Sequence, residues 1–164
     1  MSTLIKDYER FAKEAKEICK DRVYTDHLRR YAYGVDASCY SYLPKVVVKA
    51  EDEREVRRLI RLCHQCGTPF TFRAAGSSLS GQCSSEDVLI VCNDGFKKME
   101  VIDDGKALKC ECGVIGSDAN DLLKPYNRKI GPDPATLATA LVGGILNNNS
   151  SGMCCGTAQN SYKT

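Results

Sequence analysis

The chain has 164 residues, of which 43% are hydrophobic and 27% charged, and 23 basic against 21 acidic residues give a net charge of +2. This composition supports a folded core and excludes a disordered tail. The balanced charge gives no long-range attraction to nucleic acid, and no apolar run approaches the ~20 residues of a membrane span. Because the charged start also lacks the apolar segment of a secretory signal, we expect a cytoplasmic protein with no nucleic-acid partner and no membrane span.

Residues 1–43 predict one helix followed by an irregular segment. Between residues 3 and 20, apolar side chains recur on one stripe among Lys, Glu and Asp, which is typical of an amphipathic helix lying on a larger body. The sequence YAYGVDASCYSYLP at residues 31–44 is rich in tyrosine and lacks a regular period. We expect its aromatic rings to pack over the edge of a sheet.

Residues 44–82 predict a βαβ unit, with strands KVVVKA (45–50) and TPFTF (68–72) on either side of a helix. Asp52 and Glu55 have the spacing of a helix-capping box, and Gly67 ends the helix. The apolar positions of the helix recur at helical spacing: Val56, Leu59, Ile60 and Cys63. Two strands connected in this way are expected to run parallel.

Residues 83–164 predict a second α+β region. VLIVC (88–92) forms a third strand, and KMEVID and ALKCEC flank Asp104-Gly105 as the arms of a β-hairpin. A short helix is expected over residues 117–124, with Ser or Asp near its start. In the tail, Gly143-Gly144 is expected to break a helix-like stretch.

Ten cysteines are present, including the pair Cys63 and Cys66. A zinc site would need a second such pair or a downstream histidine pair, and the only histidines are His27 and His64. We therefore interpret the cysteines as reduced thiols that pack as small hydrophobic residues, and we predict no metal. A cysteine-based metal or redox protein stays open as an alternative.

The sequence RAAGSSLSGQ between the second and third strands is the first candidate site. Its glycines allow positive φ, and successive backbone N–H groups in such a loop form a concave site for an anion such as a pyrophosphate. It is neither a Walker loop nor a Rossmann fingerprint, and an ordinary Gly/Ser loop is the alternative. The candidate cofactor-binding residues are Arg73, Ala74, Ala75, Gly76, Ser77, Ser78, Leu79, Ser80, Gly81 and Gln82.

Residues 131–158 contain the second candidate site. Two prolines fix the backbone on either side of Asp133, and the small side chains that follow suit contact with a large flat ligand. A mobile surface loop is the alternative, although the interspersed Leu, Val and Ile residues favour burial. The candidate cofactor-binding residues are Pro132, Asp133, Ala135, Thr136, Thr139, Gly143, Gly144, Asn148, Ser150 and Gly152.

RAAGSSLSGQ followed by GPDPAT and VGGILNNNSSG resembles the FAD-binding domain of the vanillyl-alcohol oxidase type, also called PCMH-type. Within it, the chain is most similar to FAD-linked D-lactate dehydrogenases and glycolate oxidases. The resemblance implies an α+β fold of two subdomains with FAD between them, the first over residues 44–82 and the second, incomplete, over residues 83–164. The first loop would then wrap the pyrophosphate, and the second set of residues would line the ribityl chain and the isoalloxazine.

The resemblance also implies an activity for the full-length protein. That protein would oxidise a D-2-hydroxy acid such as D-lactate or glycolate by hydride transfer to flavin N5, and would pass the electrons to an external acceptor. Some relatives attach flavin through a histidine in the pyrophosphate loop, where this chain has Ser77, so we expect noncovalent FAD. Family members carry their catalytic residues further along the chain, so none is assigned here, and we expect this portion alone to be inactive and to bind FAD weakly. A non-catalytic FAD- or nucleotide-binding module is the alternative.

Overall fold

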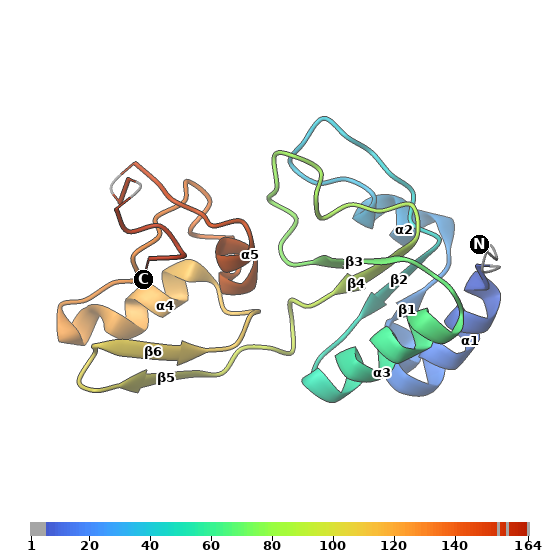
Figure 1. The fold of residues 1–164 in the computed structure, drawn as a ribbon, viewed down its shortest axis with the longest axis horizontal. Helices are drawn as coiled ribbons and strands as arrows, with labels where there is room; N and C mark the ends of the chain where they lie inside the picture. The colour runs from blue at the N-terminus through green and yellow to red at the C-terminus, as the bar shows by residue number, and fades with distance from the viewer. Residues whose placement is uncertain (1–5, 154, 157, 164) are drawn as a thin grey trace. The chain divides into compact units, whose positions relative to one another are not determined.

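The computed structural model describes residues 6–153, 155–156 and 158–163, which divide into two compact units (Figure 1). The first unit ends at Cys92 and the second begins at Asn93. Both units contain helices and strands, so the predicted α+β class is confirmed. Among the described residues, none of the helices is long and apolar enough to cross a bilayer.

A four-stranded sheet forms the centre of the first unit, in the order β1 (Val23–Tyr24), β2 (Val46–Lys49), β4 (Val88–Val91) and β3 (Phe70–Arg73). The strands β2 and β3 both run parallel to β4, whereas β1 is antiparallel to β2. The expected parallel relation of β2 and β3 is therefore confirmed, with β4 inserted between them. Because β4 belongs to this sheet, the first unit extends ten residues beyond Gln82.

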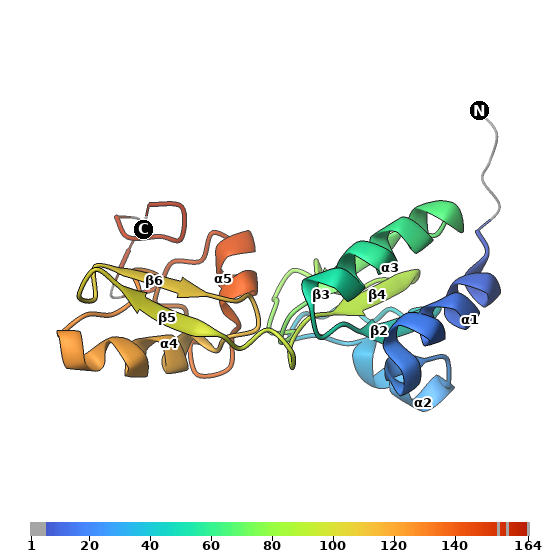
Figure 2. The ribbon, with the colours of Figure 1, turned by 90° about the horizontal axis from the view of Figure 1, so that it is seen from below.

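Helices cover both faces of this sheet, as Figure 2 shows for α3 (Glu53–Gln65) and α2 (His27–Tyr33). The helix α1 (Tyr8–Cys19) packs with α3 over one face, and the short 3-10 helix η1 (Lys20–Arg22) connects it to β1. On the other face, Tyr24 and Tyr33 pack on a second cluster formed by β2 and β4. Burial on both faces explains why β2 and β4 are continuous apolar runs rather than alternating ones.

The helix α3 begins as the sequence indicates, because the Asp52 carboxylate accepts a hydrogen bond from the Glu55 amide at 2.8 Å. The predicted buried stripe is wrong at one position: Ile60 is 38% exposed, and Leu62 is buried instead. The buried positions repeat from Leu59 through Leu62, Cys63 and Cys66, which turns Ile60 toward solvent.

The tyrosine-rich segment contains an element that its sequence did not predict. The helix α2 covers its first residues, and Asp26 caps it by accepting a hydrogen bond from the Arg29 amide at 3.0 Å. Tyr33 packs on the face of the central strands β2 and β4 rather than over the edge of the sheet, and Tyr31 and Tyr40 are exposed. Seven residues are too few to show a clear helical period, so this helix has no signal in the hydrophobic pattern.

The second unit contains the hairpin β5 (Met99–Ile102) and β6 (Ala107–Cys110), the helices α4 (Gly116–Leu123) and α5 (Val142–Asn147), and the 3-10 helix η2 (Lys124–Tyr126). The predicted hairpin is confirmed, since the Lys106 amide donates to the Asp103 carbonyl and the two residues between them have positive φ. The helix α4 spans the predicted region, but Ile115 is its N-cap and no side chain caps it.

A partly buried ion pair connects η1 to the start of α3. The Arg22 guanidinium donates to both carboxylate oxygens of Glu55 at 2.9 and 2.6 Å, and to the Lys49 carbonyl at 2.8 Å. Only 19% of the Arg22 side chain and 16% of the Glu55 side chain are exposed. The hydrogen bonds from Arg22 lower the pKa of Glu55 below its ordinary value of 4.5.

We expect Glu55→Gln to lower the free energy of unfolding by about 1–2 kcal/mol at neutral pH, because the partly buried Arg22 loses its nearer carboxylate and keeps only that of Glu51, 3.5 Å away. A carboxylate with a lowered pKa stabilises the fold above its ordinary pKa, and this stabilisation is lost as the pH falls through the lowered value. Urea unfolding followed by circular dichroism should therefore show the difference from wild type shrinking as the pH falls below ~4.

Glu53→Gln is the matched control, since Glu53 pairs with Arg57 on the exposed side of the same helix. It should change stability little at any pH. Equal effects of the two substitutions would contradict the special role of the partly buried pair.

Candidate functional site

The loop between β3 and β4 begins at the carboxyl end of the parallel strands. Ligands of open α/β sheets commonly bind outside this end. Residues 33–42, which follow α2, project from the same end, and hydrogen bonds connect the two segments (Figure 1). The predicted pyrophosphate loop therefore occupies a position where the topology allows a ligand.

The backbone of this loop has several hydrogen-bond donors without a partner. Within the described part of the chain, the amides of Ala75, Gly76, Ser77 and Leu79 have no hydrogen-bond partner. The Ser78 amide interacts with the Cys83 sulfur. Successive unpaired amides in a turn form a concave site for an anion, so the loop fits the pyrophosphate of a dinucleotide.

Contacts inside the loop fix its shape. The Ser78 hydroxyl donates to the Gln82 side-chain oxygen at 2.9 Å and accepts from the Ser80 amide at 3.2 Å. Gly76 has a φ of 80°, and a Cβ there would overlap the Arg73 guanidinium. Glycine at this position is therefore required both by the backbone conformation and by the available space.

Arg73 directs its charge into the protein rather than toward solvent. Its side chain is nearly buried, and its two terminal nitrogens donate to the Tyr33 carbonyl at 3.2 Å and the Val35 carbonyl at 2.8 Å. The guanidinium also lies 5.9 Å from the centre of the Tyr33 ring. The adjoining Ala74 is half-buried where the loop leaves β3.

A carboxylate stands at the far end of the loop. The Cys83 thiol donates to the Asp36 carboxylate at 3.3 Å, and that carboxylate also accepts from the Ser38 amide at 2.8 Å. Burial raises the pKa of Cys83, and the hydrogen bond to Asp36 raises it further. For Asp36, burial acts to raise the pKa, but hydrogen bonds from Ser38 and Cys83 help to outweigh it and lower the pKa.

The second candidate segment is folded back on itself within the second unit. Gly152 lies directly on the Asp133 backbone, so closely that a Cβ would overlap the Asp133 carbonyl. Pro132 is buried, and in the part of the chain that the structure describes, the Asp133 carboxylate has no hydrogen-bond or ion-pair partner. The segment therefore holds a free carboxylate on a fixed backbone, as the bracketing prolines indicate.

The hydroxyl groups of this segment differ in availability. The Thr139 hydroxyl and amide both donate to the Thr136 carbonyl, at 3.2 and 2.8 Å. Ala135 and Thr136 are exposed. Beyond the helix α5, the Asn148 side chain donates to the Ser150 hydroxyl at 3.5 Å.

Gly143 and Gly144 do not break a helix, contrary to the sequence-based expectation. They form the first turn of α5, and the preceding stretch is a series of turns. A Cβ on Gly143 would lie 2.7 Å from the Cβ of Cys112, and the Gly143 amide donates to the Cys112 carbonyl at 2.9 Å. The close approach of the helix to the end of β6 thus explains this glycine.

Several cysteines are buried in apolar surroundings. Burial raises the pKa of Cys63 to about 11 and that of Cys19 to about 12, so both are protonated thiols at neutral pH. Cys66 is also buried. Across the described ranges, no group of three or more His, Cys, Asp or Glu side chains could hold a metal ion.

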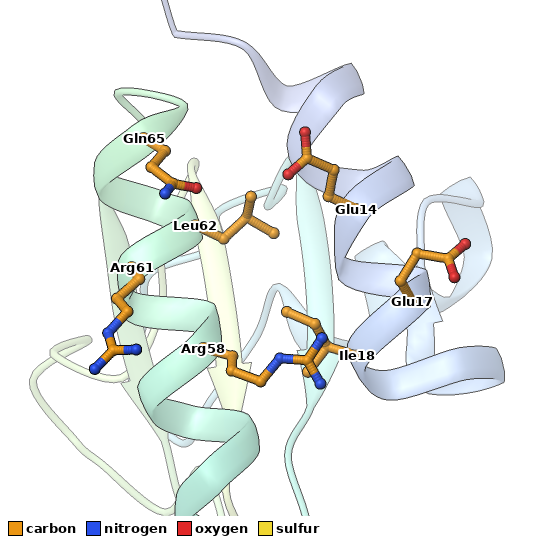
Figure 3. A pocket seen from close by; sticks show the side chains of 7 residues that line it. All are labelled: Glu14, Glu17, Ile18, Arg58, Arg61, Leu62 and Gln65. Atoms are coloured by element: carbon orange, nitrogen blue, oxygen red, sulfur yellow. The ribbon is translucent and has the colours of Figure 1, made fainter.

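A cavity of about 310 Å³ lies between α1 and α3 (Figure 3). Ile18 and Leu62 supply its apolar surface, and charged or amide side chains surround them: Glu14, Glu17, Arg58, Arg61 and Gln65. None of these residues belongs to the loop that follows β3, so this cavity is separate from the candidate pyrophosphate site.

Residues 33–42 are the part of the site that sequence reasoning missed. Their contacts with the loop come from backbone carbonyls and from Asp36 and Tyr40. Asp36 and Ser38 form a local turn that the sequence could have indicated. Nothing in the local pattern connects this turn to a loop almost forty residues later.

Comparisons with known proteins agree with this geometry. A family model described as "FAD binding domain" matches residues 44–164. The D-2-hydroxyglutarate dehydrogenase of Escherichia coli (strain K12) is 27% identical over 132 residues, which cover 78% of this chain and 13% of that protein. The glycolate oxidase subunit GlcD of Bacillus subtilis (strain 168) is 27% identical over 130 residues, which cover 76% of this chain and 27% of that protein. The chain thus spans about an eighth to a quarter of the length of these relatives.

Solved structures share the fold. Alkyldihydroxyacetonephosphate synthase superimposes with a TM-score of 0.74 at 22% identity, over 90% of this chain and 31% of that one. A p-cresol methylhydroxylase with bound substrate gives a TM-score of 0.72 at 16% identity, over 88% of this chain and 30% of that one. The family match covers well over half of the chain and includes both candidate segments. The chain therefore belongs to the FAD binding domain family, of the PCMH type.

Proposed function

We propose that this chain supplies the pyrophosphate-binding part of a flavin-dependent oxidoreductase that oxidises a D-2-hydroxy acid. The observation that carries the proposal is the row of unpaired amides in the loop after β3, in a chain of an FAD-binding family. Residues 74–82 contain no Lys or Arg, so backbone amides and serine hydroxyls are the donors that this loop offers to the phosphates. When bound, FAD supplies the hydride acceptor for such a reaction.

Each segment has a distinct task in this proposal. The amides of Ala75, Gly76, Ser77 and Leu79 donate to the pyrophosphate oxygens. The Asp133 turn and the first turn of α5 contact the ribityl chain and the ring. Catalytic residues are not assigned to this chain.

The substrate class rests on the relatives, which are named as D-2-hydroxyglutarate dehydrogenase and glycolate oxidase. Their common chemistry is a hydroxyl group on the carbon next to a carboxylate, and D-lactate shares it. The external electron acceptor and the cytoplasmic location stay predictions. A non-catalytic FAD-binding module is the second candidate, since the same loop would serve it.

Purification of the native gene product tests the function. We expect a bound flavin that is bleached anaerobically by D-lactate, glycolate or D-2-hydroxyglutarate and reoxidised by an artificial dye acceptor. If none of these three hydroxy acids bleaches the bound flavin, the non-catalytic module is favoured. A gene product that neither contains nor binds FAD would contradict both.

Gly76→Ala should lower FAD affinity at least tenfold, because its positive φ costs an alanine about 1–2 kcal/mol and its Cβ would overlap Arg73. Fluorescence titration with FAD measures the dissociation constant of the wild type and of the variant. Gly67→Ala is the matched control, since Gly67 also has a positive φ (63°) but ends α3, outside the loop. Equal loss of affinity in both variants would attribute the effect to stability and not to the loop.

We expect noncovalent FAD, because Ser77 cannot form the bond to flavin that a histidine forms in some relatives. Acid denaturation of the flavin-loaded protein should therefore release all of the flavin into the supernatant. Flavin that stays with the polypeptide after denaturing electrophoresis would contradict this expectation.

A further inference from the structure

We propose that residues 33–42, which lie before the part of the chain that the family model matches, form a buttress that holds the pyrophosphate loop in its amide-presenting shape. Arg73 is then a positioning residue that joins the buttress to the loop, rather than a phosphate ligand. The inference deepens the proposed function and rests on it, since it assigns a role at the same site.

The connection at the start of the loop is the buried guanidinium of Arg73. Both terminal nitrogens are engaged by backbone carbonyls of the buttress, those of Tyr33 and Val35. The same guanidinium occupies the space where a side chain at Gly76 would lie. Arginine suits this position because its planar fork reaches two acceptors at once, which a lysine ammonium does not reproduce.

The connection at the end of the loop consists of two contacts. The Tyr40 ring packs so closely on Gly81 that a Cβ there would lie 2.7 Å from its Cδ2 atom. Two residues further along, the Cys83 thiol donates to Asp36 of the buttress. The loop is therefore held at Arg73, Gly81 and Cys83. Within the part of the chain that the structure describes, the amides of Ala75, Gly76, Ser77 and Leu79 stay unpaired.

The buttress is itself fixed to the sheet. The Tyr42 amide donates to the Gly34 carbonyl at 2.9 Å, and Val35 and Ser41 form an isolated antiparallel bridge, so the segment closes on itself. Tyr33 packs on the buried face of β2 and β4, and the Tyr40 and Tyr42 rings stack at 6.3 Å. Such a closed segment can restrain a loop that has few hydrogen bonds of its own.

The rate at which Cys83 reacts with N-ethylmaleimide reports on this restraint, because Cys83 is partly buried at the end of the loop. Peptide mapping by mass spectrometry separates it from the other thiols. In the FAD-free chain we expect Arg73→Lys, which keeps the charge, to increase the Cys83 rate at least threefold. Tyr40→Ala should do the same, whereas Tyr40→Phe, which keeps the ring, should restore the wild-type rate.

Arg22→Lys is the matched control, since Arg22 also donates to a backbone carbonyl in the same unit but lies away from the loop. It should lower stability without changing the Cys83 rate. The proposal would be overturned if Cys83 reacted at the wild-type rate in Arg73→Lys and Tyr40→Ala. It would also be overturned if Arg22→Lys increased the Cys83 rate equally. FAD should slow Cys83 modification in the wild-type chain; absence of that protection, with the variant effects intact, would instead count against the proposed function.

Discussion

The central constraint on this fold is that a loop which binds an anion through its backbone must leave its amides unpaired. Hydrogen bonds within secondary structure normally satisfy such groups, so a loop with free amides is stabilised mainly by contacts at its ends. Here the parallel strands place the loop at the carboxyl end of the sheet, and Arg73 and Gly81 contact the segment after α2. The sheet and the segment after α2 thus add contacts at both ends of the loop to the few hydrogen bonds inside it.

The sequence predicted the elements whose signal is local. Apolar runs identified β2 and β4, Asp52 identified the start of α3, and Asp104-Gly105 identified the hairpin. The two candidate segments also stand out in the sequence, since their small residues and fixed prolines are unusual and their order matches a known family; their contacts with FAD stay a prediction. These features depend on neighbours a few residues away, so a single sequence suffices to reveal them.

Features that depend on distant contacts could not be predicted. The insertion of β4 between β2 and β3, the partners of Arg73 and the packing of Gly143 on Cys112 all join residues that lie far apart in the chain. An arginine at the start of a phosphate loop suggests a phosphate ligand, and only the structure shows that backbone carbonyls surround its guanidinium. The sequence therefore indicated FAD as the expected cofactor, but it did not indicate which contacts hold the loop.

The most direct test of this account is nuclear magnetic resonance of the ¹⁵N-labelled chain during titration with FAD. We expect the largest shift changes on the amides of Ala75, Gly76, Ser77 and Leu79, and we expect free pyrophosphate to shift the same four signals. Shift changes that concentrate between α1 and α3, around Ile18 and Leu62, or that leave these four amides unmoved at saturating FAD, would contradict it.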